Sequence, residues 1–366
     1  MLNYCANGPA GYTINNSLRF RQSASAYLSR TPSSSPTNAI KWTWSAWVKR
    51  GKLGSYGGLF DAYSNSSNWS TLMFTDTDNL VFYNLVSGAD AGITSNAVFR
   101  DPSAWYHIVF VYDSAQATAS NRVILYINGV LQTVTTPYGA IAQNEATYLN
   151  NGYASKIGLR TDGSLAYDGY MTEINFIDGQ ALTPSSFGQT SSTTGVWQPK
   201  QYTGTYGTNG FYLKFSDIAT TSGSNAGLGK DFSGNSNYWT TNNISVTSGT
   251  TYDAMIDSPT NASASGTQPV GNYAVFNPLS VATQGGSYTI SNGNLQAAET
   301  AGTTSGYVLS TMTMNGSGKW YCEVTGVSVS TSAQVGIKAN TPAELANKNG
   351  IGGASQGYAY RAGGGK

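Results

Sequence analysis

The strongest constraint on the fold is the middle of the chain, from residue 105 to residue 187. Its first part, Trp105–Asp113, is an unbroken run of β-branched and aromatic residues, the composition of a buried strand. The next part carries Asn128-Gly129 between two apolar segments, the strongest short-range signal for a β-hairpin. Residues 167–178 predict another strand, after which Thr183-Pro184 predicts the N-cap and first position of one short helical turn. The stretch therefore predicts consecutive antiparallel strands.

The part before residue 105 predicts further strands and no helix. Trp42, Trp44, Ala46 and Val48 recur at every second position and so share one face of a strand, with Trp47 on the opposite face. Short apolar runs predict strands at 17–20, 26–28, 57–60, 71–74 and 80–83. Because no segment shows a sustained apolar period of a helix, we predict an all-β fold.

Four motifs of this region resemble, in their order, a LamG domain of the concanavalin A-like lectin/glucanase superfamily. They are WTWSAWV (42–48), the strand at 105–113, the hairpin LYING (125–129) followed by Ile157-Gly158, and YDGYMTEINFIDGQAL (167–182). The resemblance implies an antiparallel two-sheet β-sandwich, a jelly roll, and members of this family bind glycans or other proteins. At Thr172 the chain departs from the family, which usually carries Asp before the Glu.

The remainder of the chain carries two further resemblances, one to a linker of bacteriophage structural proteins and one to a SPRY-like module. Segments 210–217, 228–239 and 257–261 are similar to a linker found there between LamG and SPRY-like modules. GKWYCEV (318–324), VGI (335–337) and GYAY (357–360) resemble strands in the first half of a SPRY (B30.2-like) β-sandwich, and Thr341–Glu344 has the capping-box spacing of a short helix. We therefore predict an N-terminal tail (1–14), a LamG/concanavalin A-like sandwich (15–190), a Ser/Thr/Gly-rich linker or strand-rich extension (191–271) and a partial, truncated SPRY-like domain (272–366).

The charge composition excludes two kinds of partner. Charged residues make up only 10% of the chain, and 19 basic against 18 acidic residues leave a net charge of +1. A chain so nearly neutral has no electrostatic footprint for nucleic acid or an anionic membrane. No signal peptide or bilayer-spanning apolar run is present, which predicts no membrane insertion. Cys5 and Cys322 fall in different predicted domains, so we expect two free thiols and folding in a reducing cytoplasm.

The pattern Glu173-Ile-Asn175-Phe-Ile-Asp178 is the one that invites a catalytic interpretation. Retaining glucanases of the resembled superfamily carry Glu-x-Asp-x-x-Glu on a bulged strand, where two carboxyls act as nucleophile and acid/base. Here the middle Asp is Asn and the last Glu is a shorter Asp. Without a bulge, Glu173 and Asp178 point to opposite faces. We therefore predict no catalytic residues, and we expect the only histidine, His107, to be a strand residue with a satisfied ring. Gly353-Ala-Ser355-Gln-Gly357 matches the G-x-S-x-G pattern but predicts a glycine-rich turn.

Calcium is the one cofactor that the family resemblance leaves open, since some LamG domains bind it on a loop rim. Asp61, Asp76 and Asp78 are the candidate ligands, although hard cations require several clustered carboxylates and these are scattered. Residues 231–235 imitate the start of a calcium loop but predict a turn, and Lys49-Arg50-Gly-Lys52 predicts a solvated turn after a strand.

Aromatic residues on loops are the candidate ligand-binding groups. Sugar rings stack on flat aromatic faces while neighbouring Asn and Ser bond the hydroxyls. Trp69 follows Asn65-Ser-Ser-Asn68 and so has both ingredients, with Tyr63 nearby. The alternative is an aromatic side chain that packs on its own loop.

Together these features predict a non-enzymatic phage virion structural or adhesion protein, made in the host cytoplasm, with a lectin-like domain. The resemblance to phage structural proteins implies a tail-fibre, tail-spike-associated or capsid-surface component. Its expected partners are glycans or a host cell surface and other virion proteins, and a tail-fibre type suggests a homotrimer. Two alternatives stay open: a glucanase-like glycoside hydrolase using Glu173 and Asp178, and a purely architectural module without a glycan site.

Overall fold

The computed structural model describes residues 11–261, 270–284, 287–299, 305–314, 320–330, 333–339, 341 and 357–361. The chain divides into two compact units, Met1–Tyr273 and Ala274–Lys366. All pairs between named strands are antiparallel, and the only helical elements among these residues are 3-10 turns: η1 (Gln22–Ala24), η2 (Ala119–Asn121), η3 (Pro184–Ser186) and η4 (Gly227–Gly229). The predicted all-β fold is therefore confirmed.

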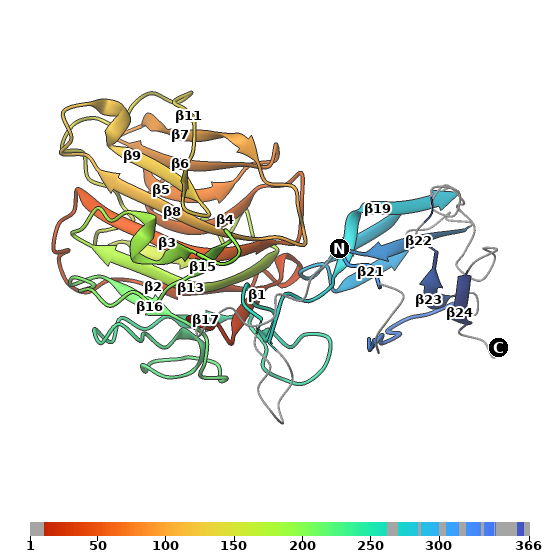
Figure 1. Cartoon of the computed structure of the whole chain (residues 1–366). Helices are drawn as coiled ribbons and strands as arrows, with labels where there is room; N and C mark the ends of the chain where they lie inside the picture. The colour runs from red at the N-terminus through yellow and green to blue at the C-terminus, as the bar shows by residue number, and fades with distance from the viewer. Residues whose placement is uncertain are drawn as a thin grey trace. The chain divides into compact units, whose positions relative to one another are not determined.

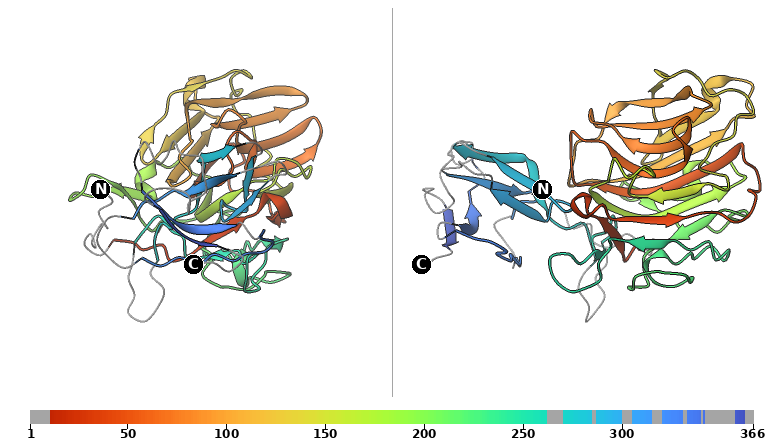
Figure 2. Two further views of the ribbon diagram at one scale, coloured as in Figure 1. Left: turned by 90° about the vertical axis from the view of Figure 1, so that its right-hand side faces the viewer. Right: turned by 180° about the vertical axis from the view of Figure 1, so that it is seen from behind.

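The first unit contains two large sheets that lie one in front of the other in Figure 1 and are seen from two further sides in Figure 2. The first sheet has the strand order β10 (Val130–Leu131), β9 (Val123–Ile127), β8 (Trp105–Asp113), β3 (Lys41–Arg50), β13 (Gly169–Asp178), β1 (Ser17–Phe20) and β18 (Ala254–Met255), and β16 (Phe211–Leu213) also pairs with β13. The second has the order β11 (Val134–Thr135), β7 (Ala89–Val98), β6 (Asn79–Val86), β5 (Asn68–Phe74), β4 (Gly57–Asn65), β12 (Ala154–Ile157), β2 (Tyr27–Arg30) and β17 (Thr240–Asn242).

Aromatic side chains fill the space between the two sheets. Trp42, Trp44, Ala46 and Val48 of β3 all face this core, as their period of two predicts, and Trp47 packs on the opposite side of the sheet. Trp42 stacks on Tyr112 with ring centroids 5.3 Å apart. Burying each such side chain stabilises the fold by about 2 kcal/mol. The inner faces of both sheets therefore form the hydrophobic core and are not available to a ligand.

Two local predictions hold in detail. Asn128 and Gly129 both have positive φ, 49° and 81°, and join β9 to β10 through a two-residue turn. The short helical turn after Thr183 is η3, with Pro184 at its first position. Strand β7 was not expected, because its sequence ADAGITSNAV lacks a run of β-branched or aromatic residues.

Residues 191–271, for which linker and strand-rich extension were both open, supply strands to the first unit. Strand β15 (Trp197–Pro199) pairs with β14 (Gly188–Thr190), while β16 and β18 join the first sheet and β17 joins the second. Arg19 of β1 and Arg21, just after that strand, both pair with Asp253, a fully buried carboxylate. This extension is thereby tied to the start of the sandwich.

The second unit contains six strands among its described residues. They form three two-stranded sheets: β19 (Phe276–Gln284) with β22 (Ser305–Ser310), β20 (Tyr288–Ser291) with β21 (Gln296–Glu299), and β23 (Gln334–Lys338) with β24 (Gly357–Arg361). The expected strand at 318–324 is wrong over residues 320–324, which have no ladder partner among the described residues. The expected helix after Thr341 and the turn at Ser355 lie outside the described residues, and the SPRY resemblance stays a prediction.

Candidate functional site

The outer face of the first sheet is covered by the chain's own segments. Two apolar clusters lie on it: Val109, Val111, Ile177, Phe187, Tyr206 and Tyr212 in one, and Ile14, Trp47, Trp105 and Tyr170 in the other. The covering residues come from the N-terminal segment and from the region after β13. This face therefore offers no broad open surface to a ligand.

His107 lies within this covered face, between two tryptophans. Its ring stacks on Trp47 at 5.0 Å and on Trp197 at 5.9 Å between centroids. Trp197 Nε1 donates to His107 Nδ1 at 3.0 Å; since an indole nitrogen can only donate, the ring proton resides on Nε2, 2.9 Å from Ser45 Oγ. Burial lowers the pKa of His107 to about 3. The prediction of a satisfied strand histidine is confirmed, and the ring is no general base.

Glu173 occupies a β-bulge of strand β13. The ladder with β3 pairs Thr172 with Trp47 and Asn175 with Ser45, so β13 carries one extra residue, and Glu173 has a φ of +51°. Tyr212 Oη donates to the Glu173 carboxylate at 2.7 Å and Tyr12 Oη donates to it at 2.9 Å. Burial raises the pKa of Glu173 to about 7, with both tyrosine hydroxyls acting in the opposite direction. The carboxyl is thus enclosed by tyrosines of the same chain.

Asp178 lies at the end of the same strand with different partners. Its oxygens accept hydrogen bonds from the backbone amides of Thr37, Asn38 and Asn209 and from Asn150 Nδ2. Since the bulge precedes residue 174, alternation along 174–178 places Asp178 on the core side with Phe176, opposite to Asn175 and Ile177. Among the described residues, Glu173 and Asp178 bond to different groups on opposite sides of β13, which is not the paired arrangement of a retaining glucanase.

The outer face of the second sheet has a different character. Strand register places Lys156, Asp61, Thr71 and Tyr83 in one row across β12, β4, β5 and β6, and Tyr63 and Trp69 side by side in the adjacent row. We call these six residues, with Arg160 and Thr161 from the loop that follows β12, the polar face. It gathers aromatic, hydroxyl and charged groups in a chain with few charges.

Trp69 is at the centre of the polar face but only 8% exposed. The Arg160 guanidinium lies over its ring, 4.0 Å from the centroid, and Tyr83 stacks on it at 4.6 Å. Each contact is of a kind that stabilises by about 1 kcal/mol. A sugar ring could stack on Trp69 only after displacing one of these neighbours.

Asp61 lies beneath the same loop and is fully buried. Thr161 N donates to its Oδ1 at 2.7 Å, whereas Oδ2 and the hydroxyls of Thr71 and Thr161 have no hydrogen-bond partner of good geometry among the described residues. Burial raises the pKa of Asp61 to about 6, although the neighbouring Thr161 lowers it. In the described structure, buried oxygen atoms without a hydrogen-bond partner are therefore concentrated below the loop that follows β12.

The outer layer of the polar face is reachable from solvent. Lys156 is partly exposed; its Nζ lies 4.5 Å from the centroid of the Tyr27 ring and donates to Thr161 O at 3.1 Å. Arg160 forms an ion pair with Asp162 at 3.5 Å, and the Asp162 side chain is 36% exposed. Tyr138 contacts Tyr83 edge-on and is 39% exposed. This layer offers donors, acceptors and aromatic edges together.

The predicted residues Asn65 and Asn68 lie at the tip of the β4–β5 hairpin, next to the polar face. Asn65 Oδ1 accepts from Ser67 N and Asn68 Nδ2, while Asn68 Oδ1 accepts from Ser87 N and Tyr148 Oη. Both carbonyl groups therefore shape the loop. Tyr63 keeps a partly exposed side chain, and its ligand role, like that of the two asparagines, stays a prediction.

The candidate calcium ligands do not come together. Asp78 is paired with Arg50 and Arg100, both at 2.8 Å, and Asp61 belongs to the polar face. Asp76 is exposed in the β5–β6 turn. Within the described ranges, no three His, Cys, Asp or Glu side chains are grouped as a metal site would require. The turn predicted at 231–235 is confirmed, since Asp231 accepts from the amides of Ser233 and Asn237.

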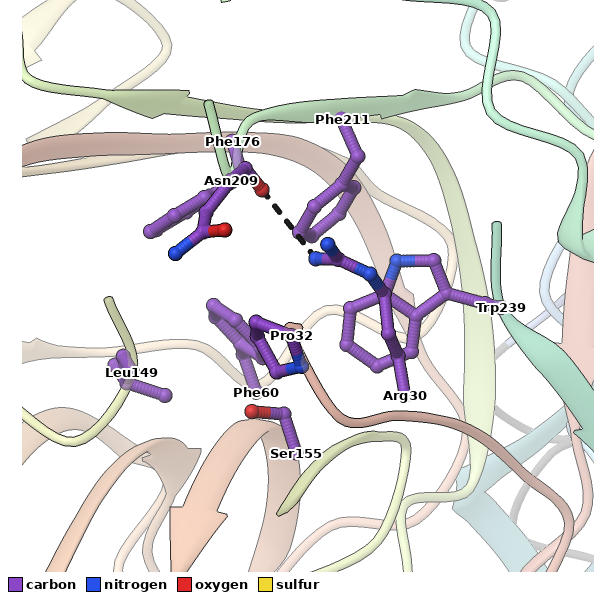
Figure 3. Close-up of a pocket in the computed structure, with 9 residues that line it drawn as sticks. All are labelled: Arg30, Pro32, Phe60, Leu149, Ser155, Phe176, Asn209, Phe211 and Trp239. Carbon is purple, nitrogen blue, oxygen red and sulfur yellow. Dashed lines mark hydrogen bonds between the residues drawn. The ribbon is translucent and has the colours of Figure 1, made fainter. Parts of the chain in front are cut away.

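A small cavity opens between the sandwich and its extension, lined by Arg30, Pro32, Phe60, Leu149, Ser155, Phe176, Asn209, Phe211 and Trp239. Figure 3 shows the Asn209 side chain directed between Phe176 and Phe60. Neither amide atom of Asn209 nor the Trp239 Nε1 has a hydrogen-bond partner in the described structure. The space open to the centre of a water molecule is ≈ 10 Å³, room for about one water. The cavity is too small for a sugar ring.

Sequence reasoning missed much of the polar face. Lys156, Arg160, Thr71 and Tyr83 carried no motif, although period-two alternation within 80–83 could have placed Tyr83 on the outer face. Lys49 and Arg50, expected in a solvated turn, are instead buried at the end of β3 and paired with Asp257 and Asp78. That expectation is wrong because the partners lie far away in sequence.

Comparison with known proteins agrees with this architecture. Residues 22–186 match the family model Laminin_G_3, described as the concanavalin A-like lectin/glucanases superfamily. This part of the first unit is therefore similar to that superfamily. No curated protein matches the sequence. Among the described residues, no helix has the length and hydropathy needed to cross a bilayer.

Several solved structures are similar at low sequence identity. The heptameric SAP-like pentraxin of Limulus polyphemus is 15% identical over 47% of this chain and 80% of its own, with a TM-score of 0.34. Domains LG4-5 of the mouse laminin alpha1 chain are 16% identical over 54% of this chain and 48% of their own, with a TM-score of 0.34. The CBM40 of the Ruminococcus gnavus IT-sialidase is 13% identical over 48% of this chain and 94% of its own, with a TM-score of 0.31.

Proposed function

We propose that the first unit is a carbohydrate-binding, lectin-like domain that binds saccharides on the polar face. The observation that carries this proposal is the contrast between the two outer faces. One is covered by the chain's own apolar clusters, whereas the other keeps Tyr63, Lys156 and Arg160 partly exposed. Tyr138, which packs against Tyr83 of the polar face, is exposed as well.

The chemistry of the outer layer suits a hydroxyl-rich ligand. Lys156 and Arg160 donate hydrogen bonds, Asp162 accepts them, and the Tyr63 and Tyr138 rings present faces or edges to the C–H groups of a sugar. Arg160 is already oriented by Trp69 and Asp162, so little side-chain freedom is lost on binding. The polar and aromatic groups needed for saccharide recognition are thus present on one surface.

A glycan array followed by calorimetry on the hits tests this proposal. Arg160→Ala and Lys156→Ala should each weaken binding about tenfold or more, because a charged hydrogen bond contributes about 2 kcal/mol. Lys200→Ala is the matched control, since Lys200 is an exposed lysine outside the polar face that donates to Ser185 O. An array without hits, or equal affinities for all three variants, would contradict the proposal.

We further propose that this domain is not an enzyme. Support comes from Glu173 and Asp178, whose oxygens are used by separate sets of donors on opposite sides of β13. Incubation with a panel of β-glucans should release no reducing ends. Release that disappears in Glu173→Gln would instead establish the hydrolase alternative.

For the whole chain we propose a role as a structural or adhesion protein of a bacteriophage virion, contacting host glycans and other virion proteins, with a trimer as the assembly. Support is the resemblance of the segments within 210–261 to a linker of phage structural proteins, which there lies between LamG and SPRY-like modules such as the one that residues 318–360 resemble. Baseplate or capsid genes next to this reading frame, and a trimeric mass in solution, are the expected results. A neighbourhood of metabolic genes would contradict the virion role.

A further inference from the structure

Three side chains meet at the end of strand β3 in an arrangement that the proposed binding function does not use. Lys49 Nζ lies 2.8 Å from Asp257 Oδ2 and 2.8 Å from Asn272 Oδ1. It also donates to Tyr273 O at 2.9 Å. Lys49 is 208 positions from Asp257 and 223 from Asn272 along the chain, so the fold brings it to them.

The ion pair of this cluster is buried and bordered by two aromatic side chains, Trp105 and Tyr170. The Lys49 side chain is 0% exposed and that of Asp257 is 3% exposed. Trp105 Nε1 donates to Asp257 Oδ1 at 3.0 Å, and the Lys49 amine lies 5.7 Å from the centre of the Tyr170 ring. The amide nitrogen of Asn272 donates to Ser103 O at 2.7 Å, which fixes the orientation of the carboxamide. The carbonyl oxygen therefore points at the amine.

Such an environment favours uncharged partners. Burial lowers the pKa of the Lys49 amine and raises the pKa of the Asp257 carboxyl, although each group partly offsets this effect for the other. Transfer of one proton along the 2.8 Å contact converts the ion pair into a neutral amine and a neutral carboxylic acid. A neutral buried amine is a nucleophile, and a buried carboxylic acid is a proton donor.

We propose that Lys49 and Asn272 join in an intramolecular isopeptide bond, with Asp257 as the catalytic residue that moves the protons. Lys49 Nζ is held against Asn272 Oδ1, and so next to the Cγ carbon bonded to that oxygen. The Nζ–Cγ bond forms, the Cγ–Nδ2 bond breaks, and Nδ2 leaves as ammonia.

The reaction balances without any further reactant. An amine and a primary amide give a secondary amide and ammonia, and no electrons change hands. Asp257 donates one proton to the departing nitrogen and accepts one from Nζ, so it ends in the protonation state in which it began. Holding the amine and amide in contact supplies the proximity that such a reaction lacks in water.

The product would be a covalent link between β3 and the segment that ends the first unit. A purely ionic role for the cluster predicts the same contacts but no change in mass. The two interpretations therefore predict different masses for the wild-type protein, and this difference can be measured.

Intact-mass spectrometry of the purified full chain, after prolonged incubation in the folded state, is the test. We expect a mass lower than that of the sequence by one ammonia, and a tryptic digest that contains one branched peptide joining the segments of Lys49 and Asn272. A full sequence mass would overturn the proposal. Fragmentation that places the loss at another residue would overturn it as well.

Variants separate the isopeptide from cyclisation of an asparagine onto its own backbone, which also releases ammonia. Lys49→Arg keeps a cation beside Asp257 and should restore the full mass, as should Asp257→Asn. Lys52→Arg is the matched control, because Lys52 follows just after the end of β3 but is exposed and bonds to Gln22, and it should keep the mass loss. A mass loss that persists in Lys49→Arg would overturn the proposal, and the branched peptide of the wild type decides the question even if a variant fails to fold.

Discussion

The only histidine of the chain should remain neutral far below its ordinary range. His107 is buried between Trp47 and Trp197, and the structure lowers its pKa from 6.5 to about 3. The difference, multiplied by about 1.4 kcal/mol per pH unit, makes protonation of the folded state cost about 5 kcal/mol. Part of this cost is the Trp197 hydrogen bond, because a protonated Nδ1 can no longer accept it.

The sign of the effect on stability follows from proton binding. Below pH 6.5 His107 binds a proton in the unfolded chain but not in the folded chain. The free energy of unfolding therefore decreases as the pH falls towards about 3. Glu173 and Asp61 act in the opposite direction, since their pKa values are raised to about 7 and about 6. The total stability therefore does not isolate His107, and a site-specific signal is needed.

Nuclear magnetic resonance supplies that signal, because one histidine gives one set of ring resonances. We expect no titration of the folded ring between about pH 8 and pH 4, and nitrogen shifts of the Nε2–H tautomer. The urea-unfolded chain is the control and should titrate near 6.5. In parallel, the unfolding free energy of the wild type should fall by about 3 kcal/mol relative to His107→Gln over the same range. A folded-state midpoint above about 5 would refute the burial argument.

Three further changes test other parts of the structure. Glu173→Gln removes a carboxyl whose raised pKa stabilises the fold at low pH and no longer does so above about 7; the wild type should therefore lose about 3 kcal/mol relative to the variant between about pH 4 and pH 8 in urea titrations. Phe176→Ala empties a site that is 1% exposed and should cost about 4 kcal/mol, whereas Val130→Ala, 63% exposed, should stay within about 0.5 kcal/mol; similar losses for both would refute the assigned core. Gly158→Ala would place a Cβ 2.2 Å from Phe20 at a φ of +88°, so its melting temperature should fall clearly below that of the wild type, and an unchanged value would contradict the packing.

Local patterns predicted the strands and turns of the first unit because they depend on neighbouring residues. The alternation in 42–48, the Asn128-Gly129 turn and η3 all involve side chains within a few positions of each other. Strand β7 was not predicted because its glycine and small polar residues acquire strand structure through pairing with β6 and β11. The sequence therefore predicted a strand or turn correctly where the local composition favoured the structure that pairing in the sheet also imposes.

The candidate site was less predictable because its geometry depends on distant residues. Trp69 was expected on a loop, but register places it in a sheet row under Arg160, which follows it by about ninety positions. Lys49 was expected in solvent, yet its partner Asp257 is 208 positions away. Pairings across such separations leave no pattern in the local sequence, because each of these charged residues taken alone is of a type that usually lies on the surface.

The location of the Lys49 cluster has a mechanical consequence. Asn272 and Tyr273 are the last residues before the second unit, and both bond to an amine on β3. Since β3 is hydrogen-bonded on both sides, to β8 and to β13, a pull on the chain at residue 274 reaches an interior strand and cannot peel the sheet from its rim. The first unit would then yield only by shearing many backbone bonds at once.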